Sequence, residues 1–127
     1  MGSTSREKEK KMTQSNAASA EVYYQAMNNK DVSAMARQLH PEIRLVTPME
    51  DLTGKDVVLE AAKKLLIFIQ SVEVQAKFEA EDHVMLAYNM YFPGIIGVCR
   101  AAALMTFKDG LIVRNELFFD ASPFKRN

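Results

Sequence analysis

The chain has 127 residues, the size of one ordinary domain, and its 16 basic and 16 acidic side chains give a formal charge of zero. This balance, with no basic excess in the body of the chain, argues against a nucleic-acid binder. The longest uninterrupted apolar runs, such as Leu65 to Ile69, are five residues long, whereas a membrane-spanning helix needs about 20. We therefore expect a soluble protein without nucleic-acid or membrane partners.

The two ends of the chain differ from its middle. Residues 1–12 are polar and carry a cluster of charges, unlike a secretory signal, so we interpret them as an added leader that ends near Met12 or as a natural solvated arm. A single domain is expected over residues 13–124, followed by a short tail at 125–127. The lone Cys99 cannot form a disulfide within the chain, which fits a reducing compartment and predicts a cytoplasmic protein.

The first half of the chain predicts three helices, because apolar residues recur there every three or four positions. The first helix covers residues 15–29. The second follows Asp31, a capping residue, and extends to Leu39. It ends at His40-Pro41, since the residue before a proline avoids helical geometry. The third helix is expected from about residue 55 to residue 70.

Strands are expected between and after these helices. Residues 42–47 form a short strand that Pro48 closes, and residues 49–54 form a turn whose charges, Glu50 and Asp51, lie in solvent or at most at the rim of a pocket. From Val72 onward the apolar period changes from about 3.6 to 2, which is typical of strands. Four strands are expected at residues 72–81, 84–92, 95–107 and 111–120. Helices on one side of an antiparallel sheet indicate an α+β fold.

Four local sequences, spread over residues 17–121, resemble one known group of proteins. They are an Asn-Asn-Lys-Asp turn at 28–31, LHPEIRLVTP at 39–48, LTGKDVVLEAAKKLL at 52–66 and FKDGLIVRNELFFD at 107–120. Their order is similar to that in the nuclear transport factor 2-like superfamily, which includes the SnoaL-like and ketosteroid isomerase-like families. The resemblance implies a cone-shaped, curved antiparallel sheet wrapped around three N-terminal helices. It also implies an apolar pocket inside the cone and a homodimer formed through the outer sheet face.

The resemblance further implies roles for individual residues. Tyr23 matches the tyrosine that donates a hydrogen bond in ketosteroid isomerases, but Thr47 and Ala103 stand where those enzymes have a basic carboxylate and a protonated acid. A hydroxyl group cannot serve unaided as that base, so steroid isomerase activity is not expected. Asp120 resembles the acid/base aspartate of SnoaL-like cyclases. It has the opposite strand parity to Phe119, however, and faces outward unless a bulge intervenes.

Strand alternation predicts the remaining pocket residues, on the premise that Ala103 faces inward. The polar side chains that could bind a carbonyl or hydroxyl group are then Tyr23, Thr47, Tyr88 and Asn115. The other side chains expected to contact a ligand are Met90, Cys99, Ala103, Met105 and Phe119. The tyrosines can equally be core residues whose hydroxyl groups are satisfied within the protein.

Two functions remain open at this point. The first is a pocket protein that binds a small apolar ligand with a carbonyl or hydroxyl group and that, if it is an enzyme, is an acid/base isomerase or cyclase without a metal. The second is a non-catalytic dimeric binding or assembly module, because Thr47 and Ala103 replace the two acids. No metal or other cofactor is expected, since two histidines and one cysteine give no ligand spacing. Nothing specific in the sequence supports a protein partner at the exposed sheet face.

Overall fold

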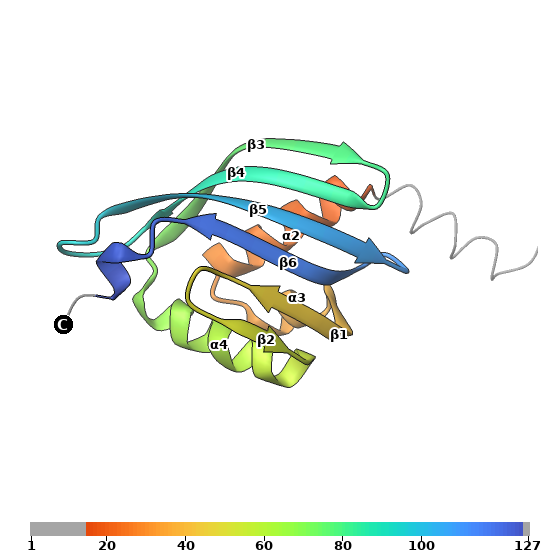
Figure 1. The fold of residues 1–127 in the computed structure, drawn as a ribbon, viewed down its shortest axis with the longest axis horizontal. Coiled ribbons are helices and arrows are strands. Elements are labelled where there is room, and N and C mark those ends of the chain that lie inside the picture. Colours follow the sequence, from red (N-terminus) through yellow and green to blue (C-terminus); the bar gives the residue numbers. More distant parts are fainter. Residues whose placement is uncertain (1–14, 126–127) are drawn as a thin grey trace, which may run out of the picture.

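The computed structural model describes residues 15–125, so the expected leader or arm and residues 126–127 of the expected tail lie outside the described part. The described chain forms helices and one six-stranded sheet (Figure 1). In chain order the elements are α2 (Asn16–Asn28), α3 (Val32–Ala36), β1 (Leu39–Val46), β2 (Asp51–Thr53), α4 (Lys55–Phe68), β3 (Ser71–Ala80), β4 (His83–Tyr91), β5 (Val98–Lys108), β6 (Leu111–Phe119) and the 3-10 helix η1 (Ser122–Phe124). No helix among these residues is long and apolar enough to cross a membrane.

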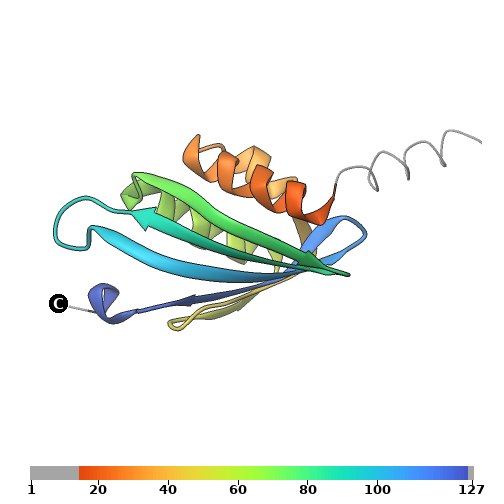
Figure 2. The ribbon, with the colours of Figure 1, turned by 90° about the horizontal axis from the view of Figure 1, so that it is seen from above.

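The strands lie in the order β2-β1-β6-β5-β4-β3, and the helices cover one face of the curved sheet (Figure 2). Strands β3 to β6 form a sequential antiparallel meander. Strand β1 pairs with β6 in parallel, a long-range pairing that the local sequence pattern did not indicate. The expected α+β class and curved sheet over three helices are confirmed.

Side chains at the helix ends tie the helices to one another and to the sheet. The Asn28 side-chain amide pairs with the backbone of Val72 as a neighbouring strand would. It donates to the Val72 carbonyl at 2.7 Å and accepts from the Val72 N–H at 2.6 Å. Lys30, which has a left-handed φ of 57°, donates from Nζ to the carbonyl oxygens of Leu66, at 2.8 Å, and Ile69. These carbonyls belong to the last turn of α4, whose orphan acceptors favour a cation. The two contacts fix α4 against the end of α2.

The boundary between α3 and β1 differs from the expectation. The helix ends at Ala36 and β1 already begins at Leu39, so Pro41 lies inside a strand. The parallel ladder with β6 is irregular between Leu39 and Arg44. A proline, which lacks an N–H donor, is tolerated in a strand at such an irregularity.

The segment expected as a turn at residues 49–54 contains the short strand β2. It pairs antiparallel with β1, and Arg44 forms a bidentate ion pair with Asp51 at 2.9 and 2.6 Å. Three residues are too few to show an alternating pattern, so the strand escaped prediction. Strand β5 begins at Val98 rather than residue 95, because Gly94 and Gly97 both adopt positive φ angles and widen the turn.

Strand β3 changes faces along its length. A bulge between Val74 and Ala76 leaves Gln75 as an extra residue, so that Gln75 and Ala76 together face one residue of β4. The side chains that follow the bulge therefore point to the opposite faces from those that simple alternation would give. Lys77 then lies on the helix side, where its ammonium group contacts Glu21 of α2 at 2.5 Å. Phe78 lies on the outer face and is 70 % exposed, whereas uninterrupted alternation would put it on the same face as Val74.

The solid core lies between α2, α3 and the end of the sheet formed by the β5–β6 hairpin. Its largest fully buried side chains are Met35, Leu39, Ile43, Leu86, Met105, Ile112 and Val84. Burying such a side chain completely stabilises the fold by about 1.5–3 kcal/mol. Packing at this end leaves the opposite end, under α4, free to hold a cavity.

Candidate functional site

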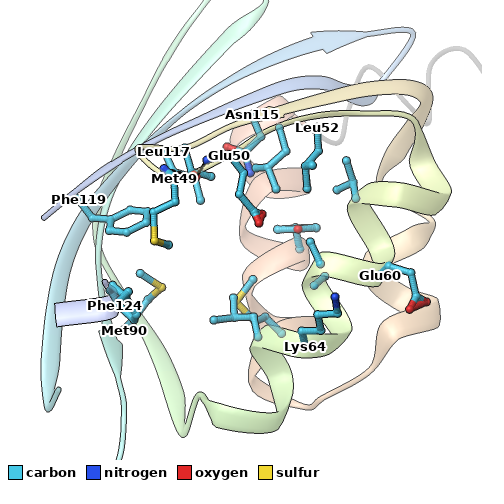
Figure 3. Close-up of a pocket in the computed structure, with 18 of the residues that line it drawn as sticks. Met49, Glu50, Leu52, Glu60, Lys64, Met90, Asn115, Leu117, Phe119 and Phe124 are labelled. Carbon is cyan, nitrogen blue, oxygen red and sulfur yellow. Dashed lines mark hydrogen bonds between the residues drawn. The ribbon is translucent and has the colours of Figure 1, made fainter. Parts of the chain in front are cut away.

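A cavity of about 500 Å³ lies between α4, the carboxyl-terminal part of α2 and the concave face of the sheet (Figure 3). This volume falls within the range of small-molecule sites. Most of its wall is apolar. It is formed by apolar side chains of α4, by Leu45 of β1 and Leu52 of β2, and by aromatic side chains. Among these, Phe124 of η1 packs edge-on against Phe92 and Phe119, with ring centroids 5.3 and 5.6 Å apart. The sequence pattern did not predict Phe124 as a pocket residue.

The structure brings most of the predicted pocket residues to this cavity. Those that line it are Tyr23, Thr47, Tyr88, Met90, Asn115 and Phe119. Three others, Cys99, Ala103 and Met105, are buried on the same sheet face but do not line the cavity. Ala103 is short and lies between Leu86 and Leu117 on the neighbouring strands, while Met105 belongs to the solid core. Burial raises the pKa of the Cys99 thiol, which makes it a weak nucleophile.

Asp120, the predicted acid/base residue, lies outside the cavity lining and is exposed. Its Oδ1 accepts a hydrogen bond from the Ser122 N–H at 3.0 Å, which holds the pKa of the carboxyl group below its usual value. From Arg114 to Phe119 strand β6 stays in register with β5, so no bulge within this stretch turns Asp120 inward. The geometry makes it a turn residue that precedes η1.

Three buried tyrosines form one side of the cavity. Tyr23 and Tyr24 come from α2 and meet edge-on at 5.5 Å, and Tyr24 lies 4.7 Å from the ring of Tyr88 on β4. Burial raises the pKa of Tyr23 to about 12 and raises those of Tyr24 and Tyr88 above the usual tyrosine value. All three therefore remain protonated at neutral pH, where their hydroxyl groups can donate hydrogen bonds but cannot act as bases.

Asn115 is a polar residue in an apolar setting. It is only 5 % exposed and lines the cavity from the middle of β6, and its Oδ1 accepts no hydrogen bond from any residue that the structure describes. Its cross-strand neighbours are Leu45 and Met105, neither of which has a side-chain donor. An unpaired buried acceptor of this kind costs about 1–3 kcal/mol, so it calls for an explanation.

Thr47 organises the loop between β1 and β2. Its N–H donates to the Glu50 carbonyl at 2.8 Å, and its Oγ1 accepts from the N–H groups of Met49 and Glu50 at 3.0 Å each. The hydroxyl group predicted to bind a ligand thus first holds a tight turn. The turn directs the Glu50 side chain into the space between the sheet and α4 (Figure 3).

Glu50 is therefore the carboxylate of the cavity, in place of Asp120. Two other charged residues, Glu60 and Lys64, line the rim from α4, but Glu60 turns away from the cavity (Figure 3) and pairs with Lys63 at 3.3 Å. Glu50 forms no ion pair with any residue in the range 15–125. Glu50 is exposed and lines the cavity, which agrees with the charge expected in solvent or at the rim of a pocket, although its role as a site residue was not predicted. The signal that could have found it is its place three residues after Thr47, in a turn closed by Pro48.

The donor set does not resemble a metal centre. Among residues 15–125 no three His, Cys, Asp or Glu side chains come close enough together to hold a metal ion. The chemistry that the cavity offers comes from a carboxylate, tyrosine hydroxyl groups and a side-chain amide. Such groups bind polar atoms and move protons.

Comparison with known proteins places this geometry in context. The chain is similar in fold to a protein from Kribbella flavida DSM 17836 (TM-score 0.80, 21 % identity, covering 86 % of this chain and 89 % of that one). It is similar to an NTF2-like protein of unknown function from Cytophaga hutchinsonii ATCC 33406 (TM-score 0.78, 19 % identity, 88 % and 96 % covered). It also resembles TerC, crystallised with polyporic acid (TM-score 0.73, 17 % identity, 86 % and 94 % covered).

These structural likenesses concern the fold, since all lie below 25 % identity. No curated protein matches the sequence. A model of the SnoaL-like domain matches residues 20–115, which is more than half of the chain and includes most of the cavity wall. The chain belongs to the SnoaL-like domain family.

Proposed function

We propose that this protein binds a small, largely apolar ligand with a carbonyl or hydroxyl group, and that the Glu50 carboxylate transfers a proton on that ligand. The observation that carries the proposal is a single carboxylate directed into an apolar cavity that tyrosine hydroxyl groups also line. A carboxylate is a competent general base when it lies within reach of the proton, and it does not need a metal. The reaction class would be an acid/base isomerisation or cyclisation.

The proposed step needs only groups of this chain. Glu50 takes a proton from a carbon next to the ligand carbonyl, so that a C–H bond breaks and an O–H bond forms on the carboxyl group. The electron pair moves into an enolate, whose oxygen accepts a hydrogen bond from a tyrosine hydroxyl such as that of Tyr23. Return of the proton to another carbon isomerises the ligand. Attack of the enolate carbon on a second carbonyl forms a C–C bond and opens the C=O π bond, and the resulting alkoxide takes the proton back from Glu50, so the ligand is cyclised. Thr47 contributes by holding the turn that positions Glu50.

Two further facts support this proposal. TerC, which has a similar fold, was co-crystallised with polyporic acid. Tyr23 has a raised pKa of about 12, which keeps it in the donor form over the whole neutral range. We place the protein in the cytoplasm, where its single Cys99 would stay reduced.

The proposal can be tested without knowing the natural ligand. 2-Tetralone is a compact apolar ketone with an acidic C–H beside its carbonyl. In D₂O, nuclear magnetic resonance follows the replacement of that hydrogen by deuterium, and saturation-transfer spectra report binding independently. We expect the protein to accelerate the exchange above the buffer rate, and Glu50→Gln to lower the protein-dependent rate by about 100-fold or more, the usual contribution of a general base.

Glu60→Gln is the matched control, because Glu60 also lies at the rim but turns away from the cavity. This variant should exchange at the wild-type rate. Exchange that survives in Glu50→Gln would exclude Glu50 as the base. Binding of 2-tetralone without any acceleration would leave a ligand pocket and remove the proton transfer.

A dimeric assembly role is the second candidate, and one surface favours it. On the outer face of the sheet, Phe78, Met85 and Phe118 are 70, 38 and 46 % exposed. Phe78 lies beside Met85 and Leu104 in one row of the ladder, and Phe118 lies beside Ala102 and Ala87 in the next, so β3, β4 and β5 carry no charge in these two rows. A homodimer through this face would cover the patch. Sedimentation equilibrium tests it: Phe78→Lys should shift the protein toward monomer, and a monomeric wild type would refute the dimer.

A further inference from the structure

Asn115 lies at the inner end of the cavity. It lines the cavity from the sheet (Figure 3) but is only 5 % exposed, whereas its cross-strand neighbour Met105 is fully buried and does not line the cavity. Ile112, on the same strand as Asn115, is also fully buried and outside the lining. A ligand that enters past the charged rim therefore reaches Asn115 where the open space ends.

The two polar atoms of the Asn115 side chain differ in what can reach them. Oδ1 is inaccessible and has no hydrogen-bond partner among residues 15–125. Nδ2 donates to no residue in this range either, but it remains accessible. Because the residue is otherwise buried and lines the cavity, the space in front of Nδ2 is the cavity itself. The orientation that presents the amide nitrogen to the cavity is thus the one that leaves the oxygen unpaired.

The polar groups of the cavity therefore differ with depth. A side-chain amide nitrogen carries N–H donors and accepts nothing, so Asn115 offers only a donor at the inner end. The ionised Glu50 carboxylate accepts hydrogen bonds and lies at the exposed rim. A carbonyl oxygen fits the inner end, because it needs a donor and brings no hydrogen of its own. A hydroxyl group there can also accept from Nδ2, but the nearby acceptor Oδ1 is out of reach of its hydrogen.

We propose that the Asn115 amide nitrogen donates a hydrogen bond to a carbonyl oxygen at the leading end of the ligand. This inference rests on the ligand-binding part of the proposed function and narrows the ligand to one that enters carbonyl first. A hydrocarbon in the same place would remove water from Nδ2 without replacing the hydrogen bond, which weakens its binding. An apolar residue at this position would remove that discrimination.

2-Tetralone and tetralin test the inference, because they share the same fused rings and differ by one carbonyl oxygen. Both are titrated into isotope-labelled protein, and proton–nitrogen correlation spectra give their dissociation constants and report on each assigned side-chain amide. We expect 2-tetralone, but not tetralin, to move one Asn115 amide proton downfield, since a hydrogen bond to oxygen deshields the proton. The Asn28 side-chain amide is the internal control. It is engaged with Val72 and lies outside the cavity lining, so its signals should not move with either probe.

A substitution measures the contribution of the amide to selectivity. Water solvates the ketone more strongly than the hydrocarbon, so the informative quantity is the ratio of the two affinities within each protein. Asn115→Leu should shift this ratio against 2-tetralone by about 10-fold, as the loss of one net hydrogen bond to a buried group predicts. Glu60→Gln, at the rim and turned outward, should leave the ratio unchanged. Circular dichroism confirms that each variant is folded before its affinities are compared.

The outcomes separate this inference from the proposal on which it rests. Binding of both probes to the wild type without a downfield shift at Asn115, or with an equal shift for both, would overturn the carbonyl contact and leave a ligand pocket. An unchanged ratio of affinities in a folded Asn115→Leu would overturn the contact as well. Failure of both probes to bind the wild type would overturn the pocket and the contact together. The spectra of the wild type decide the question even where Asn115→Leu does not fold.

Discussion

Replacing Asn115 by leucine should make the free protein more stable. The unpaired Oδ1 costs about 1–3 kcal/mol, and Leu, whose side chain has nearly the same shape, removes that cost without overpacking. A net gain of about 1–2 kcal/mol corresponds to a rise in Tm of about 4–8 °C for a domain of this size. The physical reason is that a buried polar atom without a partner loses its hydration and gains no hydrogen bond in return.

Differential scanning calorimetry on the ligand-free protein measures this change, and Asn28→Leu provides the matched comparison. The Asn28 amide is fully engaged with the backbone of Val72, so the same substitution there should lower Tm. Opposite signs at the two asparagines would support the reasoning. A lower or unchanged Tm for a well-folded Asn115→Leu would refute it, because the amide would then be satisfied in the free protein, for example by an ordered water molecule.

Two other properties follow from the structure. Burial raises the pKa of Tyr23 from 10.0 to about 12. As the pH rises, the tyrosine therefore loses its proton in the unfolded chain before it does so in the folded protein. The contribution of Tyr23 to the free energy of unfolding is complete below pH 10 and falls between about pH 10 and 12. Urea unfolding across this pH range measures the fall in the free energy of unfolding. Its slope against pH should be shallower in Tyr23→Phe than in the wild type, by up to about 1.4 kcal/mol per pH unit. An equal slope in both proteins would contradict this prediction. Lys30→Met should lower the free energy of unfolding by about 1–2 kcal/mol, because the last carbonyls of α4 lose their donor. Lys30→Gly should lower the free energy of unfolding by less, since glycine relieves about 1 kcal/mol of left-handed backbone strain. Identical urea midpoints for the wild type and Lys30→Met would disprove the role of the ammonium group.

The parts of the fold that were predicted correctly are those encoded by local periodicity. Alternation along β4, β5 and β6 placed Tyr88, Met90 and Asn115 on the concave face, where the structure has them. The parallel pairing of β1 with β6 and the short strand β2 depend on contacts between distant segments. No local pattern encodes these contacts.

The site was harder to predict than the fold, for a similar reason. Resemblance directed attention to Thr47 and Asp120 as positions of catalytic groups, whereas the carboxylate that reaches the cavity is Glu50. Its direction results from three hydrogen bonds within one turn, which a list of residue types cannot show. Asn115 Oδ1 is likewise unpaired because its cross-strand neighbours have no side-chain donor. Those neighbours come from other strands, so the sequence around Asn115 does not reveal them.

The bulge at Gln75 has a consequence for comparing this chain with its relatives. Because Gln75 and Ala76 together face one residue of β4, a relative without the bulge would have a strand one residue shorter and yet keep every side chain on the same face. An alignment without a gap at this point would match inward residues of one protein with outward residues of the other. Phe78 would then be compared with core positions, and an outer surface would be mistaken for an interior.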